Sequence, residues 1–312
     1  MTLLNKSSNA LVILMLVIPL SILSGILFPY IGQLFSPYLL VWLGALLFLN
    51  LLKLEIKDLG ITFAKPKMIL ILSIVKLFII PLLLYSIAYV FFSPMALPVL
   101  LLSGISTGLG APFVVNFVGG RLPLVVGLII ATSIAVPFIL PTLVYLLFKT
   151  NFSIPILDMM LLLTSALFIP LALGIIVKKY SSKLARIAEA NSLGASIGLM
   201  VLINFAMFAS YSSYFFTEKI FVLQTILISF LLYAAYGLIG YLFVIFAHKN
   251  STINDRISGF IAMTYINNVL VVVFAQHFFS PQVAALAALY NIPYYIGILI
   301  LKKWSFGVML SD

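Results

Sequence analysis

The stretch Gly104–Gly120, which reads GISTGLGAPFVVNFVGG, lies within hydrophobic sequence but is incompatible with one uninterrupted helix. It holds five glycines and Pro112. Inside a helix, glycine costs about 1 kcal/mol and proline about 3 kcal/mol relative to alanine. Irregular backbone survives at membrane depth only where protein or water covers its N–H and C=O groups. The stretch therefore predicts a helix that breaks near mid-membrane, an arrangement that many transporters use to build a binding site.

The composition around this stretch is that of an all-α integral membrane protein. Of the 312 residues, 64% are hydrophobic and 8% are charged, whereas soluble domains are about 45–50% apolar and 25% charged. The chain contains no cysteine. Disulfides, thiolate metal sites and cysteine nucleophiles are therefore excluded.

Ten hydrophobic segments approach the length of about 20 residues that a membrane helix needs. They cover residues 9–30, 38–54, 68–92, 95–118, 122–148, 155–177, 192–211, 220–247, 254–279 and 281–301. The fourth contains the predicted break, and the ninth carries Thr264, Asn267 and Asn268 near its middle. Two halves of five segments have opposite orientations in the membrane. The layout predicts two inverted five-helix repeats, each with one broken helix, the fourth and the ninth.

The basic residues indicate how the chain is oriented. With the N-terminus in the cytoplasm, all but three of the 17 Lys and Arg residues fall in cytoplasmic segments. The exceptions are Lys149 and Lys219 outside and Lys76 within a span. This is the bias of the positive-inside rule. We expect a multi-pass protein of the cell membrane with both termini cytoplasmic, whose net charge of +10 meets anionic lipid rather than nucleic acid.

Lys76 is the basic residue deepest in a predicted span. It lies eight residues after Met68, or about 12 Å along a helix. A lysine at a helix centre costs roughly 2.5–3.5 kcal/mol on insertion scales and often marks an ion or substrate path. Either its side chain reaches back to the cytoplasmic surface, or the ammonium is buried in the bundle. No acidic residue lies deep in a span, so a buried ammonium favours a small anionic substrate or a lysine that exchanges its proton.

Polar side chains at the two breaks are the other candidates for a binding site. Asn267 and Asn268 are adjacent and point to different faces of a helix, so they either bond to neighbouring helices or line a site. Ser106 and Thr107 lie at the first break, and Asn116 follows it. The helix N-termini created by both breaks would direct positive dipole ends at an anion.

Several other classes of protein are excluded by missing motifs. No span holds the two aspartates that an intramembrane aspartyl protease needs, and Asp-rich magnesium motifs are absent. His248 and His277 lack metal-ligand spacing, and no GxxxxGK phosphate loop is present. We therefore expect neither an enzyme nor a metal or other cofactor.

Three stretches resemble the bile acid:sodium symporter family. They are LLVWLGALLFLNLLKLEIKDLGITFAKPKMILILSIVKLFIIPLLLY (Leu39–Tyr85), IPLALGIIVKKY (Ile169–Tyr180) and INNVLVVVFAQHFFSPQVAALAALYNIPYYIGILI (Ile266–Ile300). The resemblance implies ten helices with inverted repeats. It also implies a panel domain, about residues 9–54 and 155–211, and a core domain, about residues 68–148 and 220–301. Helices four and nine of the family cross at their breaks.

The chain differs from the family at the positions that bind sodium. Lys76 aligns with a sodium-site glutamine, and Met263 stands where the family usually has a glutamate. Asn267 replaces a glutamine, while Asn268 matches the family's asparagine. Further oxygen ligands of the family are missing here, at Ala111, Pro112, Val125 and Ile129. The resemblance therefore implies altered or absent sodium coupling, with the Lys76 ammonium in the place of one sodium ion.

The sequence favours a secondary transporter that moves an organic anion by alternating access. Besides Lys76, the candidate site comprises Thr107, Ala111, Pro112, Asn116, Met263, Thr264, Asn267 and Asn268. One alternative is an exporter of organic acids, because GLGAPFVVNFVGG (Gly108–Gly120) also resembles the crossover of auxin efflux carriers. Arsenite exporters fit less well because their helix-four cysteine has no counterpart. Another alternative is a membrane sensor on the same fold that does not transport.

Overall fold

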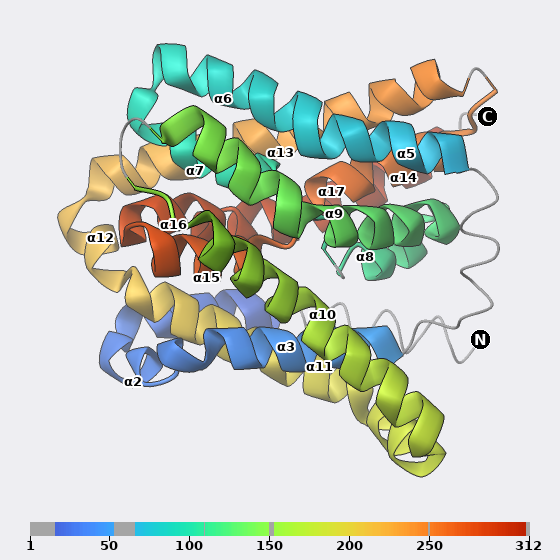
Figure 1. Cartoon of the computed structure of the whole chain (residues 1–312), viewed down its shortest axis with the longest axis horizontal. Coiled ribbons are helices and arrows are strands. Elements are labelled where there is room, and N and C mark those ends of the chain that lie inside the picture. The colour runs from blue at the N-terminus through green and yellow to red at the C-terminus, as the bar shows by residue number, and fades with distance from the viewer. Residues whose placement is uncertain (1–15, 53–65, 109, 150–152, 249, 310–312) are drawn as a thin grey trace. The chain divides into compact units, whose positions relative to one another are not determined.

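The computed structural model describes residues 16–52, 66–108, 110–149, 153–248 and 250–309 (Figure 1). In these ranges every regular element is a helix, apart from one isolated β-bridge between Thr107 and Ile266. The predicted all-α class is confirmed for this part of the chain. It follows from the composition, because a helix satisfies its backbone polar groups internally where lipid offers them no partner.

Contacts along the chain divide it into two compact units. The first unit consists of Met1–Leu54 and Ser165–Gln224, and the second of Glu55–Thr164 and Thr225–Asp312. Two long helices, α10 (Ile156–Tyr180) and α13 (Lys219–Ala247), pass from one unit to the other.

The first unit is built around a helix of 29 residues, α11 (Ser182–Ser210). It packs against α3 (Leu39–Leu52) and α2 (Pro29–Gln33). Other elements are η1, a 3-10 turn at Ser36–Tyr38, and α12 (Ser212–Thr217). A Cβ added to Gly25, in the apolar helix Leu16–Leu27, would lie 2.5 Å from the Phe205 carbonyl oxygen. Glycine therefore allows that helix to approach α11 closely.

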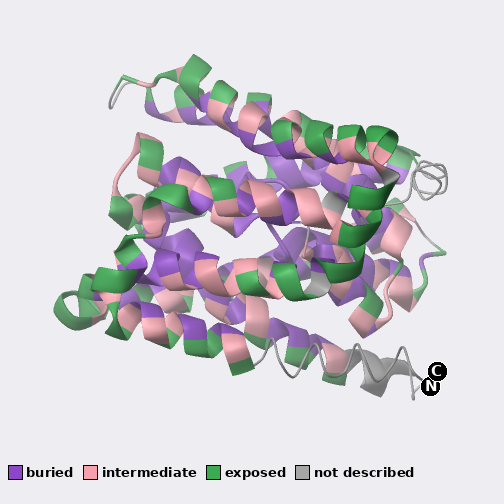
Figure 2. Ribbon diagram, turned by 90° about the horizontal axis from the view of Figure 1, so that it is seen from below, coloured by how far each residue is buried: buried purple, intermediate pink, exposed green. Residues whose placement is uncertain are grey.

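The second unit holds the sequence that contains both predicted breaks. Its helices are α5 (Pro66–Ile74), η2 (Val75–Ile79), α6 (Ile80–Phe91), η3 (Ser93–Met95), α7 (Ala96–Ser103), α8 (Ala111–Val118), α9 (Leu122–Phe148), α14 (Ile253–Thr264), α15 (Asn268–Phe278), α16 (Pro281–Leu289) and α17 (Asn291–Met309). The short helices α7, α14, α15 and α16 are buried along most of their length and form the core of this unit. Many other helices of the chain carry exposed residues along one side (Figure 2).

Six described helices are long and apolar enough to cross a membrane. They are Pro29–Asn50, Pro66–Phe91, Leu122–Phe148, Ile156–Tyr180, Lys219–Ala247 and Pro281–Lys303, and the bent pair Lys183–Ser192 with Gly194–Ser210 makes a seventh. Leu16–Leu27, Ser93–Ser103 and Asn268–Phe278 are apolar but shorter. The chain is thus a multi-pass membrane protein, while the count of ten spans and the inverted repeat stay predictions.

A π-helical turn interrupts the span Pro66–Phe91 at Val75–Ile79, where the N–H of Ile80 donates to the Val75 carbonyl. Pro81 follows directly. Proline has no N–H to donate, and its ring clashes with the carbonyl four residues earlier, here that of Leu77. Widening the turn is one way in which a helix accommodates such a residue. This turn contains Lys76, and π-turns are frequent at functional sites.

Candidate functional site

Both predicted breaks are present, and the two lie against each other in a region that we call the crossover. The first separates α7 from α8, and the second separates α14 from α15. Extended backbone pairs between them: the N–H of Asn267 donates to Ser106 O at 3.0 Å, and the N–H of Gly108 donates to Tyr265 O at 2.7 Å. This pairing satisfies backbone groups that the breaks would otherwise leave exposed in an apolar interior.

Glycine is required at position 108 by the closeness of the two chains. A Cβ there would lie 2.6 Å from the Ile266 oxygen and 2.8 Å from its carbonyl carbon. Those are backbone atoms, which cannot move aside without separating the breaks. Gly119 has a different role, because its φ of 97° is left-handed. Its N–H and that of Gly120 both donate to Val115 O, which ends α8.

Three of the last carbonyl groups of α14 accept hydrogen bonds from side chains of other helices. The Thr107 hydroxyl donates to Ala262 O at 2.8 Å, the Lys76 ammonium to Met263 O at 2.9 Å, and the Tyr290 hydroxyl to Thr264 O at 2.9 Å. A helix leaves its last four carbonyls without partners and carries about half a negative charge at that end. The site therefore favours a cation, and Lys76 supplies one.

Lys76 is fully buried, with 0% of its surface exposed. The alternative in which it reaches back to the membrane surface is wrong for this structure. Its Nζ lies 5.3 Å from the centre of the Tyr236 ring, a distance typical of a cation–π contact. Among the described residues no carboxylate pairs with it, and Asp255, which is also buried, pairs with Arg121. Carbonyl oxygen and an aromatic face thus replace a counter-ion.

A cluster of buried and half-buried tyrosines surrounds this end of α14. Tyr236, Tyr265 and Tyr290 are fully buried, and Tyr233 and Tyr294 are half-buried beside them. The hydroxyls of Tyr233 and Tyr265 lie 3.1 Å apart, and the rings of Tyr265 and Tyr294 meet edge to face with centroids 4.7 Å apart. This cluster was not predicted from the sequence. The available signal was tyrosine spacing of three on α13 and four on α16–α17, which places each pair on one helix face.

The two predicted asparagines have different surroundings in the structure. The Asn268 amide donates to Asn291 Oδ1 at 2.7 Å, so the interpretation as a contact between helices holds for this residue. Asn267 is the N-cap residue of α15, with 8% of its surface exposed. The Thr264 hydroxyl donates to Phe260 O in its own helix at 2.9 Å. Met263 contributes its main-chain carbonyl rather than its side chain.

The remaining predicted residues lie on or beside α8 and α9. Ala111 is buried as the first residue of α8, and Pro112 occupies a position in its first turn that proline favours. Asn116 is exposed on α8. Val125 and Ile129 are buried on α9. One turn further on, the Thr132 hydroxyl accepts the N–H of Thr107 at 3.1 Å and so ties the first break to α9.

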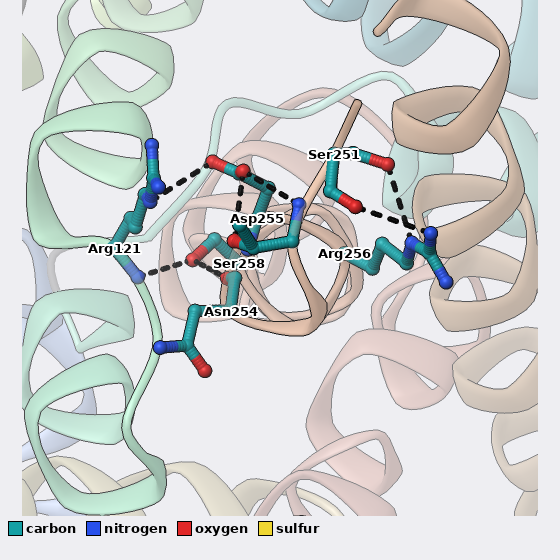
Figure 3. A network of polar contacts seen from close by, with 7 residues as sticks. Arg121, Ser251, Asn254, Asp255, Arg256 and Ser258 are labelled. Carbon is teal, nitrogen blue, oxygen red and sulfur yellow. Dashed lines mark hydrogen bonds and ion pairs between the residues drawn. The ribbon is translucent and has the colours of Figure 1, made fainter. Parts of the chain in front are cut away.

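A second polar network joins α8–α9 to the start of α14 (Figure 3). Arg121 Nε lies 3.2 Å from Asp255 Oδ1, and the N–H of Arg121 donates to the Ser258 hydroxyl at 2.5 Å. Asp255 also accepts the N–H of Thr252 at 3.0 Å, and the Thr252 hydroxyl accepts the N–H of Asp255, which makes a capping box. The network fixes one end of α14 while Lys76 and its neighbours hold the other.

Comparison with known proteins identifies the family. Residues 40–218 match the Sodium Bile acid symporter family, a stretch that covers more than half of the 312 residues. No curated protein is significantly similar to the chain. The matched region includes Lys76 and the first break, and the predicted resemblance is confirmed. The chain therefore belongs to the Sodium Bile acid symporter family.

Proposed function

We propose that this protein is a secondary transporter of a small organic anion that works by alternating access without sodium coupling. In this proposal, Lys76 is a cation built into the chain and replaces one that other members of the family take from solution. Its substrate binds beside the two breaks. The first unit serves as the panel and the second as the core, in a fold of ten helices and two inverted repeats.

One observation carries the proposal: the Lys76 ammonium donates to Met263 O at the end of α14, at 2.9 Å. The resemblance implies that both positions correspond to sodium ligands of the family, a glutamine and a glutamate. A positive charge at a helix C-terminus is favourable. The ammonium stands where a cation is wanted, while the side-chain oxygens that would bind sodium are missing from Ala111, Pro112 and Met263.

Anion selectivity follows from the same charge. The second unit has a buried ammonium with no carboxylate partner among its described residues. Burying a charge without an opposite charge is expensive, so binding of an anion nearby would offset part of that cost. The Lys76 ammonium is part of the chain and cannot leave the site as a bound sodium ion would. The driving force for transport must therefore come from a proton, from the substrate gradient or from exchange.

The test begins with ligands, because the substrate is unknown. A thermal-shift screen covers bile acids, small carboxylates and sulfonates, with sodium and pH varied separately. Ligands that stabilise the protein are then used for flux measurements in proteoliposomes. We expect stabilisation by an organic anion that is the same in sodium and in choline. A sodium-dependent shift would overturn the proposal.

Flux measurements separate a transporter from a sensor. A transporter accumulates labelled ligand in vesicles, whereas a sensor binds it without flux. Loading the vesicles or the bath decides between uptake and export. Stabilisation by a ligand with no flux in either direction would contradict the assignment as a transporter.

A further inference from the structure

A groove of 380 Å³ runs between α5 and α9 on the second unit. The two helices are in contact there (Figure 1). From the first helix and the π-turn, one stripe of residues lines it: Pro66, Ile69, Leu70, Ser73, Ile74, Leu77 and Phe78. From α9 it is lined by Ala131, Ala135 and Ile139. The two alanines create the hollow, because larger side chains at this spacing would fill it.

The dimensions of the groove match those of one lipid chain. From Pro66 to Phe78 the helix rises by roughly 18 Å, and one leaflet occupies about half of a hydrocarbon core of about 30 Å. The rim is apolar and exposed at Leu70, Ile74 and Phe78. The groove therefore starts at the end of a membrane span and follows it through one leaflet.

One polar side chain that lines the groove has no hydrogen-bond partner. The Ser73 side chain is only 8% exposed, and its hydroxyl makes no hydrogen bond within the described structure. Buried serines in helices commonly donate to the carbonyl four residues earlier, as Ser103 does to Val99 O. Leaving such a hydroxyl unpaired in apolar surroundings is unfavourable. Ser73 lines the wall of the groove, so an occupant with an acceptor oxygen at this depth would give its hydroxyl a partner.

Charge distinguishes the two ends of the groove. Lys67 is exposed beside Pro66, at the end where the span begins. The opposite end, at Phe78 and Ile139, is apolar. Lys67 and Ser73 are six residues apart, or roughly 9 Å along the helix. A ligand that fits this sequence of groups has an anionic head, then an oxygen acceptor, then a hydrocarbon chain.

We propose that this groove binds one acyl chain of an anionic glycerophospholipid. Its phosphate lies at Lys67, an ester carbonyl accepts from the Ser73 hydroxyl, and the chain continues past Ala135 towards Phe78. Basic residues at a membrane surface attract anionic lipid headgroups. This site is separate from the crossover, so it stands whether or not the protein transports an anion.

Native mass spectrometry of the delipidated protein in detergent tests this site. Phosphatidylglycerol and phosphatidylcholine with the same acyl chains are the two probes. Wild type is expected to retain the first more strongly. Ala135→Phe fills the groove and should weaken binding of both lipids by at least about tenfold, since the ring takes the place of the chain. Ala172→Phe, at an exposed alanine on α10, is the matched control and should bind as wild type does.

Two further pairs of variants test the polar contacts. Ser73→Ala should weaken binding by about fivefold, the effect of one lost hydrogen bond. Ser86→Ala, which alters an exposed serine of the same span, should have no effect. Lys67→Gln should weaken binding of phosphatidylglycerol by about fivefold and leave binding of phosphatidylcholine unchanged. Lys303→Gln should leave the binding of both lipids unchanged. If Ala135→Phe does not fold, these two pairs of variants still test whether the groove binds lipid. Equal retention of both lipids by wild type, or Ser73→Ala and Ala135→Phe binding as wild type does, would overturn the proposal.

Discussion

The ammonium of Lys76 lies 2.9 Å from the main-chain oxygen of Met263, and the two residues are 187 positions apart in the chain. One belongs to a π-turn in a membrane span and the other to the last turn of a half-helix. The contact joins a buried cation to the negative end of a helix. It gives the crossover a fixed charge of its own.

Replacing Lys76 with methionine should separate transport from stability. The variant loses the bond to Met263 O, which costs about 1–3 kcal/mol, but it also removes a buried charge, which offsets that loss. We expect the free energy of unfolding in mixed micelles to change by less than about 2 kcal/mol. Flux should fall by at least about tenfold. Flux at the wild-type rate with an unchanged pH profile would contradict the role of the ammonium.

Gly108→Ala should disrupt the crossover. The new methyl group would meet Ile266 O at 2.6 Å, against backbone that the paired breaks hold in place. Overpacking of this kind costs about 1–3 kcal/mol or more. Thermal denaturation in detergent, followed by circular dichroism, measures the loss.

Gly198→Ala is the matched control for that variant. It also lies in a helix of a membrane span, but a Cβ there would meet nothing within 4 Å. Alanine should stabilise α11 by up to about 1 kcal/mol. Equal effects of the two substitutions would show that the close approach of the breaks is unimportant.

Thr132→Val should cost more than Thr142→Val, although both residues lie on α9. Each hydroxyl donates to the carbonyl four residues earlier, but Thr132 also accepts the buried N–H of Thr107. Losing that acceptor leaves a buried donor unpaired, at a cost of about 1–3 kcal/mol. The half-buried Thr142 accepts no such bond and should change stability by less than about 0.5 kcal/mol. A comparison of midpoints in a thermal denaturation series checks the order.

Asp255→Ala should destabilise the protein more than Arg121→Ala. The aspartate side chain is 3% exposed and also forms the capping box of α14, whereas that of Arg121 is 46% exposed. Losing a helix cap costs about 1 kcal/mol, and an exposed ion pair contributes about 0–1 kcal/mol. Hydrogen exchange of the first turn of α14 provides the measurement. Greater deprotection by Arg121→Ala would show that the ion pair, rather than the cap, holds this turn.

Much of the fold could be predicted because the sequence contains strong local signals. Glycines and Pro112 in apolar sequence predicted the first break, and the asparagines at 267–268 marked the second. Lys76 could be singled out because a cation inside a span is rare. The tyrosine cluster was missed because each tyrosine, taken alone, looks like ordinary packing. The groove between α5 and α9 depends on two alanines that carry no signal of their own.

The sequence by itself determined that this is a helical membrane protein, that a helix breaks within Gly104–Gly120 and that Lys76 is an unusual cation. These conclusions follow from the cost of glycine, proline and charge in a lipid-exposed helix, which is a local property. Only the tertiary structure decided what the ammonium contacts. Its partner is a backbone carbonyl, which every residue possesses, and the choice of Met263 depends on which helix end the fold brings to the π-turn.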